Sequence, residues 1–483
     1  MATGLGIVFQ SSTGPFGAVA QLVAHLHGME GVRGSNPLSS TLDEKAVSHT
    51  REAAFSLSGP AGRADGDGPT GSSGPTRSGQ EGRMGRGPGE VPFRLRDVAL
   101  AAFLPSVVSG TGHAALLPVL ALLARDLGAS VGQAALVVAL LGVGSLLTSL
   151  PAGALVARVG ERRALVGAGV VDAAAMVLAA TAPSVPVLAG AVVLSGASWS
   201  VFLLARQGFL ISVAPAHLLA RAMSTLGGSH RVGAFLGPVA GAGLLAATGS
   251  LRSVFWMAAA LALLSGLVVL LVRDVGTRAD PVPAARPTVG SVLAAHRHVL
   301  LTLGSAVVVI GAARSLRATV LPLWADHVGI SAEATSLVFG VAALVEIALF
   351  YPAGWVMDRA GRTVVAVPVV VTIGLGVSLL PLAGGLPAFV ALAVLMAVGN
   401  GMGSGIVMTL GADTAPAEGR SQYLGGWRLA GDLGSSVGPL TVAGLAALVP
   451  LGTACVVTGG TVMAGAGWVR HWVARAERRR RPG

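Results

Sequence analysis

Residues 151–163 read PAGALVARVGERR, and residues 352–362 read PAGWVMDRAGR. Both stretches open with Pro-Ala-Gly and continue into a basic segment that contains another glycine. They start 201 residues apart, at Pro151 and Pro352, and each follows a long apolar run. A motif that recurs at this interval, each time after an apolar run, indicates that the chain repeats a long structural unit.

The composition indicates a membrane protein. Hydrophobic residues make up 53% of the chain and charged residues only 11%, whereas a soluble domain is about 25% charged. The 69 glycines suit helices that pack closely in lipid. The one cysteine, Cys455, excludes an internal disulfide framework and a cysteine-rich metal site. We expect neither a metal nor a cofactor. The abundance of Ala, Gly and Arg, with Lys45 as the one lysine, is typical of a GC-rich bacterial genome.

Residues 1–93 differ from the rest, because they are polar, rich in Gly, Ser, Pro and Arg, and without periodicity. One interpretation is a genuine disordered tail. The interpretation that we favour is a gene model that starts too early, since residues 17–40 can be encoded by DNA that resembles a transfer RNA gene. Translation would then begin at Met84 or near Val91. The apolar run Leu5–Phe9 is too short for a signal peptide.

From Val98 onward the sequence predicts an all-α membrane protein with twelve transmembrane helices, since each helix needs about 20 mostly apolar residues. The predicted spans are 98–121, 131–152, 164–183, 186–207, 223–247, 253–272, 298–324, 333–353, 364–382, 387–409, 422–449 and 452–473.

The spans group into two pseudo-symmetric six-helix halves, 94–272 and 298–473, with a Pro-rich linker at 273–297 and a basic tail at 474–483. A second repeat supports this grouping. GAFLGPVAG at 233–241 and GSSVGPLTV at 434–442 place Pro238 and Pro439 again 201 residues apart. Such internal repetition is typical of secondary transporters.

Arginine predicts the orientation. If the N-terminus is cytoplasmic, the cytoplasmic loops and the C-terminal tail carry sixteen arginines, and the external loops carry only Arg125 and Arg252. This distribution favours two cytoplasmic termini in the cytoplasmic (inner) membrane, and it favours lipid headgroups rather than nucleic acid as the partner of the net charge of +11. The sixteen are Arg158, Arg162, Arg163, Arg221, Arg273, Arg278, Arg286, Arg297, Arg359, Arg362, Arg420, Arg475, Arg478, Arg479, Arg480 and Arg481.

The repeated loop resembles the G-x-x-x-D-R-x-G-R signature of the major facilitator superfamily. The second copy is intact, with Gly354, Asp358, Arg359, Gly361 and Arg362. The first copy has Ala157 in place of the acid, and it matches at Gly153, Arg158, Gly160, Arg162 and Arg163. The resemblance, which covers residues 95–473, implies that these loops form a latch that opens with the cytoplasmic side. Because Ala157 cannot take the part of the acid, the first copy forms such a latch only if Glu161 substitutes for it. The alternative is that the arginines serve topology alone.

The fifth predicted span resembles the motif of the drug:proton antiporter branch of that family, which implies export. Its residues are Gly233, Gly237, Pro238 and Gly241, and the eleventh span repeats them in part as Gly434, Gly438 and Pro439. Glycines allow close helix approach, and proline can kink a helix. The alternative is ordinary close packing.

Charged side chains inside the spans are candidate functional groups, because each costs about 2.5–3.5 kcal/mol unless it is paired or hydrated. Arg314 and Arg317 share a helix face that suits an anionic solute. Burial favours the protonated form of Glu346, which predicts a proton carrier. The alternative is a static ion pair between Glu346 and one of the two arginines.

Five further polar residues belong to the same set of candidates. Arg428 and Asp432 are four apart and can pair within one helix. Arg231 occupies the same repeat position as Asp432, so a pair between the fifth and eleventh spans is also open. Asp172 and His113 either line the solute cavity or serve packing.

The leading hypothesis is a monomeric secondary transporter that exports a small organic solute or drug in exchange for protons. The alternatives are a proton-coupled uptake symporter for a sugar or organic anion, and a non-transporting membrane sensor on the same fold. The sequence contains no P-loop, H-E-x-x-H or G-x-S-x-G motif, so an enzyme is not expected.

Overall fold

The computed structural model describes residues 103–214, 218–271, 289–416 and 418–480. The predicted extension 1–93, the start at Met84 and most of the linker 273–297 lie outside these residues. The chain divides into Met1–Pro88 and Gly89–Gly483, and every described residue belongs to the second unit. All regular secondary structure in the described ranges is helical, in agreement with the predicted fold class.

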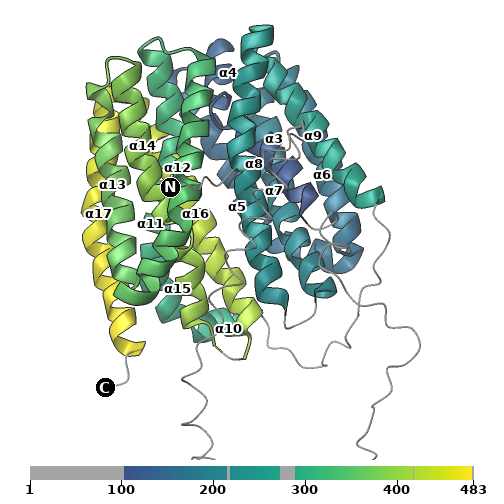
Figure 1. The fold of residues 1–483 in the computed structure, drawn as a ribbon, viewed down its shortest axis with the longest axis vertical. Coiled ribbons are helices and arrows are strands. Elements are labelled where there is room, and N and C mark those ends of the chain that lie inside the picture. Colours follow the sequence, from purple (N-terminus) through teal and green to yellow (C-terminus); the bar gives the residue numbers. More distant parts are fainter. Residues whose placement is uncertain (1–102, 215–217, 272–288, 417, 481–483) are drawn as a thin grey trace, which may run out of the picture. The chain divides into compact units, whose positions relative to one another are not determined.

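Seven helices make up the N-terminal segment (103–271), and many of them run alongside one another in Figure 1. They are α3 (Leu104–Leu116), α4 (Leu120–Asp126), α5 (Val131–Val159), α6 (Glu161–Ala180), α7 (Val185–Val213), α8 (Leu219–Thr248) and α9 (Leu251–Leu271). Helices α3 and α4 form a bent pair with an angle of 42° at a short break.

The C-terminal segment (289–480) follows a similar order. It contains α10 (Val289–Ala295), α11 (Arg297–His327), α12 (Ala332–Ala360), α13 (Arg362–Leu379), the 3₁₀ turn η2 (Leu380–Leu382), α14 (Leu386–Met402), α15 (Ile406–Thr414), α16 (Arg420–Ala446) and α17 (Leu451–Arg480).

Ten described helices are long and apolar enough to cross a membrane, and the bent pair α3/α4 makes eleven if it counts as one span. Helix α16 does not meet that criterion, although it is 27 residues long, and its sequence includes Arg428 and Asp432. Twelve spans in two six-helix halves therefore stays a prediction.

Several helices extend beyond the predicted spans. Helices α5 and α12 continue through the motif residues to Val159 and Ala360, because polar residues at a membrane surface do not interrupt helical hydrogen bonding. Helix α17 reaches Arg480, so the start of the predicted tail is helical. The end of the predicted linker contains α10 and the first residue of α11.

The backbone repeats at the interval seen in the sequence. Gly160 and Gly361 end α5 and α12 with φ of 84° and 100°, a conformation that favours glycine. Ser130 and Ser331 cap the starts of the same two helices by accepting a bond from a backbone N–H three residues later. We call the end of the helices at Gly160 and Gly361 the motif end, and the end at Ser130 and Ser331 the opposite end.

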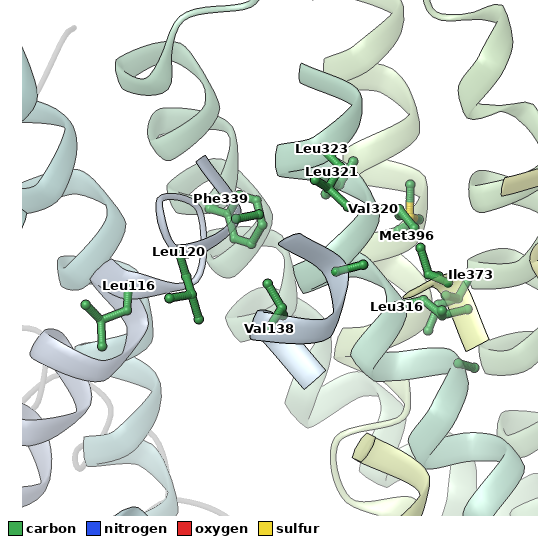
Figure 2. Close-up of a cluster of buried hydrophobic side chains, with 14 of the residues drawn as sticks. Leu116, Leu120, Val138, Leu316, Val320, Leu321, Leu323, Phe339, Ile373 and Met396 are labelled. Atoms are coloured by element: carbon green, nitrogen blue, oxygen red, sulfur yellow. The ribbon is translucent and has the colours of Figure 1, made fainter. Parts of the chain in front are cut away.

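Two helix pairs make the largest contacts between the segments. Helix α5 packs against α16, and α8 packs against α12. Small residues allow this approach: a Cβ on Gly142 would lie 2.9 Å from Oγ of Ser436, and one on Gly340 would lie 2.9 Å from a methyl group of Val239. The largest buried cluster also spans both segments, and Figure 2 shows Leu120 and Val138 of the first with Phe339 and Leu321 of the second.

Candidate functional site

In the C-terminal segment, Arg314 is held by α14. Its Nε donates to Oδ1 of Asn400 at 2.7 Å, and its Nη1 donates to the carbonyl oxygen of Gly403 at 3.4 Å. Gly403 lies in the break between α14 and α15. No described carboxylate forms an ion pair with Arg314, and its Nη2 has no acceptor in that part of the chain.

One helical turn away, Arg317 contacts the carboxylate of Glu346. The distance from Nη1 to Oε1 is 2.8 Å, and the two side chains are 13% and 14% exposed. The Arg317 guanidinium also lies 5.5 Å from the ring centroid of Phe339. This is the geometry of the static ion pair. Whether Glu346 carries a proton stays a prediction.

The N-terminal segment holds an aromatic cluster around Trp199 of α7. The ring of His113 on α3 stacks on it with centroids 4.0 Å apart and an interplanar angle of 6°. Phe202 lies 5.6 Å from Trp199, and His230 of α8 lies 5.7 Å away. Sequence analysis missed Trp199 and His230 as part of one cluster, because a helical sequence does not show which aromatic residue a histidine will meet.

Asp172 of α6 lies beside this cluster. Its Oδ1 accepts a hydrogen bond from Oγ of Ser195 on α7 at 2.6 Å. A small pocket opens between α3, α6 and α7, and it is lined by Ser109, Ala168, Gly169, Asp172, Ser198, Trp199 and Phe202.

These two polar clusters occupy equivalent repeat positions. His113 and Arg314 are 201 residues apart, as are Trp199 and Asn400. The contact of α3 with α7 thus recurs between α11 and α14, with stacking in one segment and a guanidinium–amide bond in the other. The chemistry of the equivalent positions has diverged.

Contacts between the segments follow the same symmetry. Oγ of Ser149 on α5 donates to Oδ2 of Asp432 on α16 at 2.7 Å. The Arg231 guanidinium on α8 lies 3.9 Å from the ring centroid of Phe350 on α12. Ser149 and Phe350 are 201 residues apart, and so are Arg231 and Asp432. The structure therefore places Arg231 and Asp432 in two equivalent contacts rather than in one pair.

Two predicted neighbours remain close to these contacts. Nε of Arg428 lies 3.8 Å from Oδ2 of Asp432 along α16, the spacing that sequence analysis noted. Arg231 interacts electrostatically with Glu346, so the charged residues of α8, α11 and α12 form one group across the segments.

At the opposite end, Arg125 and Asp326 form an exposed ion pair between the segments. Nε of Arg125 donates to Oδ2 of Asp326 at 3.2 Å, and Nη1 donates to the carbonyl oxygen of Ala129 at 2.6 Å. Arg125 and Asp326 are themselves 201 residues apart. This opposite-charge register was the signal that sequence analysis missed.

At the motif end, Arg362 contacts other helices of the C-terminal segment. Its Nε donates to Oδ2 of Asp413 at 2.9 Å, and its Nη1 donates to the carbonyl oxygen of Met357 at 3.2 Å. Glu477 of α17 accepts from the Arg362 backbone N–H and from the Thr363 hydroxyl. Asp413 and Glu477 were not candidates from the sequence, because neither belongs to the motif.

The other latch residues are mostly exposed. Asp358 is exposed and has no ion-pair partner among the described residues, and Arg359 lies 4.1 Å from the ring centroid of Trp355. Arg158 and Gly153 are exposed as well. Arg162 donates to the carbonyl oxygen of Leu270 at 2.8 Å. The latch role of these residues is a proposal taken up below.

The Gly-Pro motifs lie where helices approach closely. A Cβ on Gly233 would lie 2.7 Å from the carbonyl oxygen of Val107 on α3, and one on Gly237 would overlap that of Thr111. Gly434 and Gly438 approach Val308 and Ala312 of α11 in the same way. Gly241 meets Ala115 at an ordinary 3.7 Å. Helices α8 and α16 continue through Pro238 and Pro439 without a break.

No group of three or more His, Cys, Asp or Glu side chains in the described ranges is arranged to hold a metal ion.

Comparison with known proteins gives a family and a fold. The model of the Major Facilitator Superfamily matches residues 102–439 and 303–483. A comparison with curated proteins gives no match.

Solved structures with a similar fold are transporters. A POT family transporter in complex with 5-aminolevulinic acid has 12% identity and a TM-score of 0.65, over 80% of this chain and 98% of that one. A peptide transporter POT in complex with sulfate has 16% identity and a TM-score of 0.64, over 79% and 95%. A bacterial homolog of the human lysosomal transporter Spinster, in an inward-facing and unoccupied conformation, has 14% identity and a TM-score of 0.62, over 81% and 98%.

Proposed function

Since the chain belongs to the major facilitator superfamily, we propose that this transporter exports a small organic solute across the cytoplasmic membrane, in exchange for protons. The solute site lies between the two segments, at the group formed by His113, Trp199, Arg231, Arg314 and the Arg317–Glu346 pair. Alternating access in such a protein is a rocking of one half against the other around a fixed site.

The symmetric contacts between the segments carry the proposal. Ser149–Asp432 and Arg231–Phe350 lie within the helices, and Arg125–Asp326 lies at the opposite end. At the motif end, Asp358 is exposed. With the orientation predicted from arginine, we interpret this arrangement as a state that is closed to the outside and open toward the cytoplasm.

Export rests on the Gly-Pro resemblance, and one observation favours a second candidate. Arg314 has no carboxylate partner among the described residues, and a buried cation of this kind favours an anionic ligand. Proton-coupled uptake of an organic anion is therefore the second candidate, and the direction of solute flux decides between the two.

Cross-linking at the opposite end tests alternating access. In a Cys455→Ala background, Arg125→Cys and Asp326→Cys joined by a short reducible bifunctional thiol reagent should hold that end closed. Solutes identified by a thermal-shift screen would then be assayed in proteoliposomes. Solute flux should fall to the level of protein-free liposomes and return after reduction.

The matched controls are Arg125→Cys alone and Asp326→Cys alone, which cannot join the segments and should leave flux unchanged by the reagent. Flux that persists through the inter-segment cross-link would contradict alternating access. Binding without flux in any variant would favour the membrane sensor.

Asp358→Asn tests the proposed latch. The substitution keeps the size of the side chain and removes its charge, so the outward-open state should lose a charge-assisted contact. The population open toward the cytoplasm should rise. The measurement is the rate at which a maleimide labels a cysteine placed at exposed Gly153. An unchanged labelling rate would leave Asp358 with a topological role only.

A further inference from the structure

The pocket beside Asp172 lies apart from the group of arginines at the proposed solute site. It places one carboxylate among small and aromatic side chains of three helices. Ser195 donates to Oδ1 of Asp172. No other described residue donates to this carboxylate, so Oδ2 has no protein donor in that part of the chain.

No described cation forms an ion pair with Asp172. Helices α7, α9 and α5 pack against α6, and their charged residues are Arg206, Arg252 and Arg158. The Arg206 guanidinium lies 5.9 Å from the ring centroid of Phe202, which lines the pocket, but it forms no ion pair with Asp172. Arg252 binds the carbonyl oxygens of Ala180 and Ala182, and Ala180 is about 12 Å along α6 from Asp172.

The remaining titratable neighbours are no better placed to neutralise Asp172. Glu161, Arg162 and Arg163 begin α6, about 13–16 Å along the helix. Arg158 ends α5 on the far side of Gly160. From α3 and α8, His113 and His230 approach the pocket through Trp199, on whose ring they pack. Arg231, next to His230, lies on Phe350 instead.

Glu346 presents the opposite situation. Its carboxylate lies 2.8 Å from Arg317 and interacts electrostatically with Arg314 and Arg231, so its charge is matched by three cations. Of the two acidic residues proposed from the sequence for coupling, Asp172 is the one without an ion-pair partner among the described residues. An unmatched carboxylate inside a membrane protein is stable when it is protonated or hydrated.

We propose that Asp172, rather than Glu346, binds and releases the coupling proton, with the pocket between α3, α6 and α7 as its access to water. This inference rests on the proposed proton-coupled transport. A hydronium ion in the pocket gives one proton to Oδ2 of Asp172 and leaves as water. The neutral carboxyl later returns that proton to water, while Ser195 stays bonded to Oδ1.

Trp199 connects this proton site to the solute site. One part of its side chain lines the Asp172 pocket, and its ring stacks on His113. His113 occupies the repeat position of Arg314. The charge on Asp172 is therefore separated from the proposed solute by one aromatic ring, which lets protonation and solute occupancy influence each other.

Infrared difference spectroscopy of the full chain in detergent, titrated with acid, tests the proton site without a solute. We expect the carboxyl C=O band of the protonated wild type to lose one component in Asp172→Asn and to keep it in Glu346→Gln. Ser195→Ala should shift the midpoint of that component and not remove it. Should Asp172→Asn fail to fold, Asp172→Glu should keep a titrating component with a changed midpoint.

Three outcomes would overturn the inference: a band unchanged by Asp172→Asn, a band unchanged by Asp172→Glu, or a component lost in Glu346→Gln. Loss of the protonated component when sodium replaces choline at fixed pH would assign the pocket to an alkali cation instead.

Proteoliposomes with a trapped pH dye separate this inference from the proposed function. With a solute identified by thermal shift, the wild type should move protons when solute moves, and Asp172→Asn should exchange solute without moving protons. A titrating Asp172 in a chain that moves no solute would refute the transport proposal and leave the proton site standing. Normal proton movement by Asp172→Asn would refute the proton site and leave the transport proposal standing.

Discussion

Glu346→Gln is expected to lower the free energy of unfolding by about 3–5 kcal/mol, because it removes one partner of a buried ion pair. The pair is 2.8 Å long, and both side chains are largely buried. Glutamine keeps the shape of the glutamate and leaves the charge of Arg317 uncompensated in a group that already contains Arg314 and Arg231. Thermal unfolding in detergent would measure the loss.

A second substitution provides the control. Arg317→Gln in the Glu346→Gln background removes the stranded cation, and it should recover part of the lost stability. Arg125→Gln breaks an exposed pair and should cost only about 0–1 kcal/mol. Equal effects of the buried and exposed substitutions would contradict this account of Glu346.

The same variant also tests the sequence-based assignment of the proton to Glu346. A proton carrier replaced by glutamine should lose transport driven by a pH gradient, keep solute exchange at equal pH, and lose little stability. If Glu346 serves only as an ion-pair partner, the variant should be much less stable. The fraction that remains folded should still couple solute transport to protons. Stability, driven transport and exchange therefore need to be measured on one preparation.

Gly237→Val is expected to prevent α8 from packing on α3. A Cβ at this position would overlap the backbone carbonyl oxygen of Thr111 and lie 2.8 Å from the backbone nitrogen of Ala115. Backbone atoms cannot rotate away as a flexible side chain can, so the helices must separate. We expect a loss at or above the upper end of the about 1–3 kcal/mol typical of overpacking.

The measurement is the fraction of protein that elutes as a single species after extraction into mild detergent. Gly243→Val is the matched control, because it lies on the same helix with nothing within 4 Å of the added Cβ. Gly438→Val should behave like Gly237→Val, since it meets the carbonyl oxygen of Ala312 at the equivalent position. Similar yields of the Gly237 and Gly243 variants would show that close approach is not the role of the motif.

The repeat was predictable because it depends on local sequence. The positions of Gly160 and Gly361 followed from the loop motif, and both have the positive φ that a tight turn between helices requires. Helix ends were less predictable. An apolar run shows which part of a helix lies in lipid, and it does not show where the helix ends. Helices α5 and α17 both continue beyond their apolar runs.

Side-chain partners depended on packing between distant helices. The sequence offered Glu346 two arginines three residues apart, and only the placement of α12 against α11 selects Arg317. It also allowed a pair between Arg231 and Asp432. In the structure Arg231 contacts Phe350 and Asp432 contacts Ser149, and these two contacts lie at equivalent positions of the repeat. The contacts of Asp413 and Glu477 with Arg362 arise from helices that the motif does not include.

The ion pair between Arg125 and Asp326 makes one end of the protein sensitive to dissolved salt. Its side chains are 36% and 39% exposed, and mobile ions screen exposed charges over about 8–10 Å at ordinary ionic strength. The membrane keeps the two solutions apart, so only the electrolyte that bathes this end weakens the attraction. Under the proposed alternating access, a rise in salt on that side alone should shift the conformational balance toward opening there, by no more than the about 0–1 kcal/mol that an exposed pair contributes.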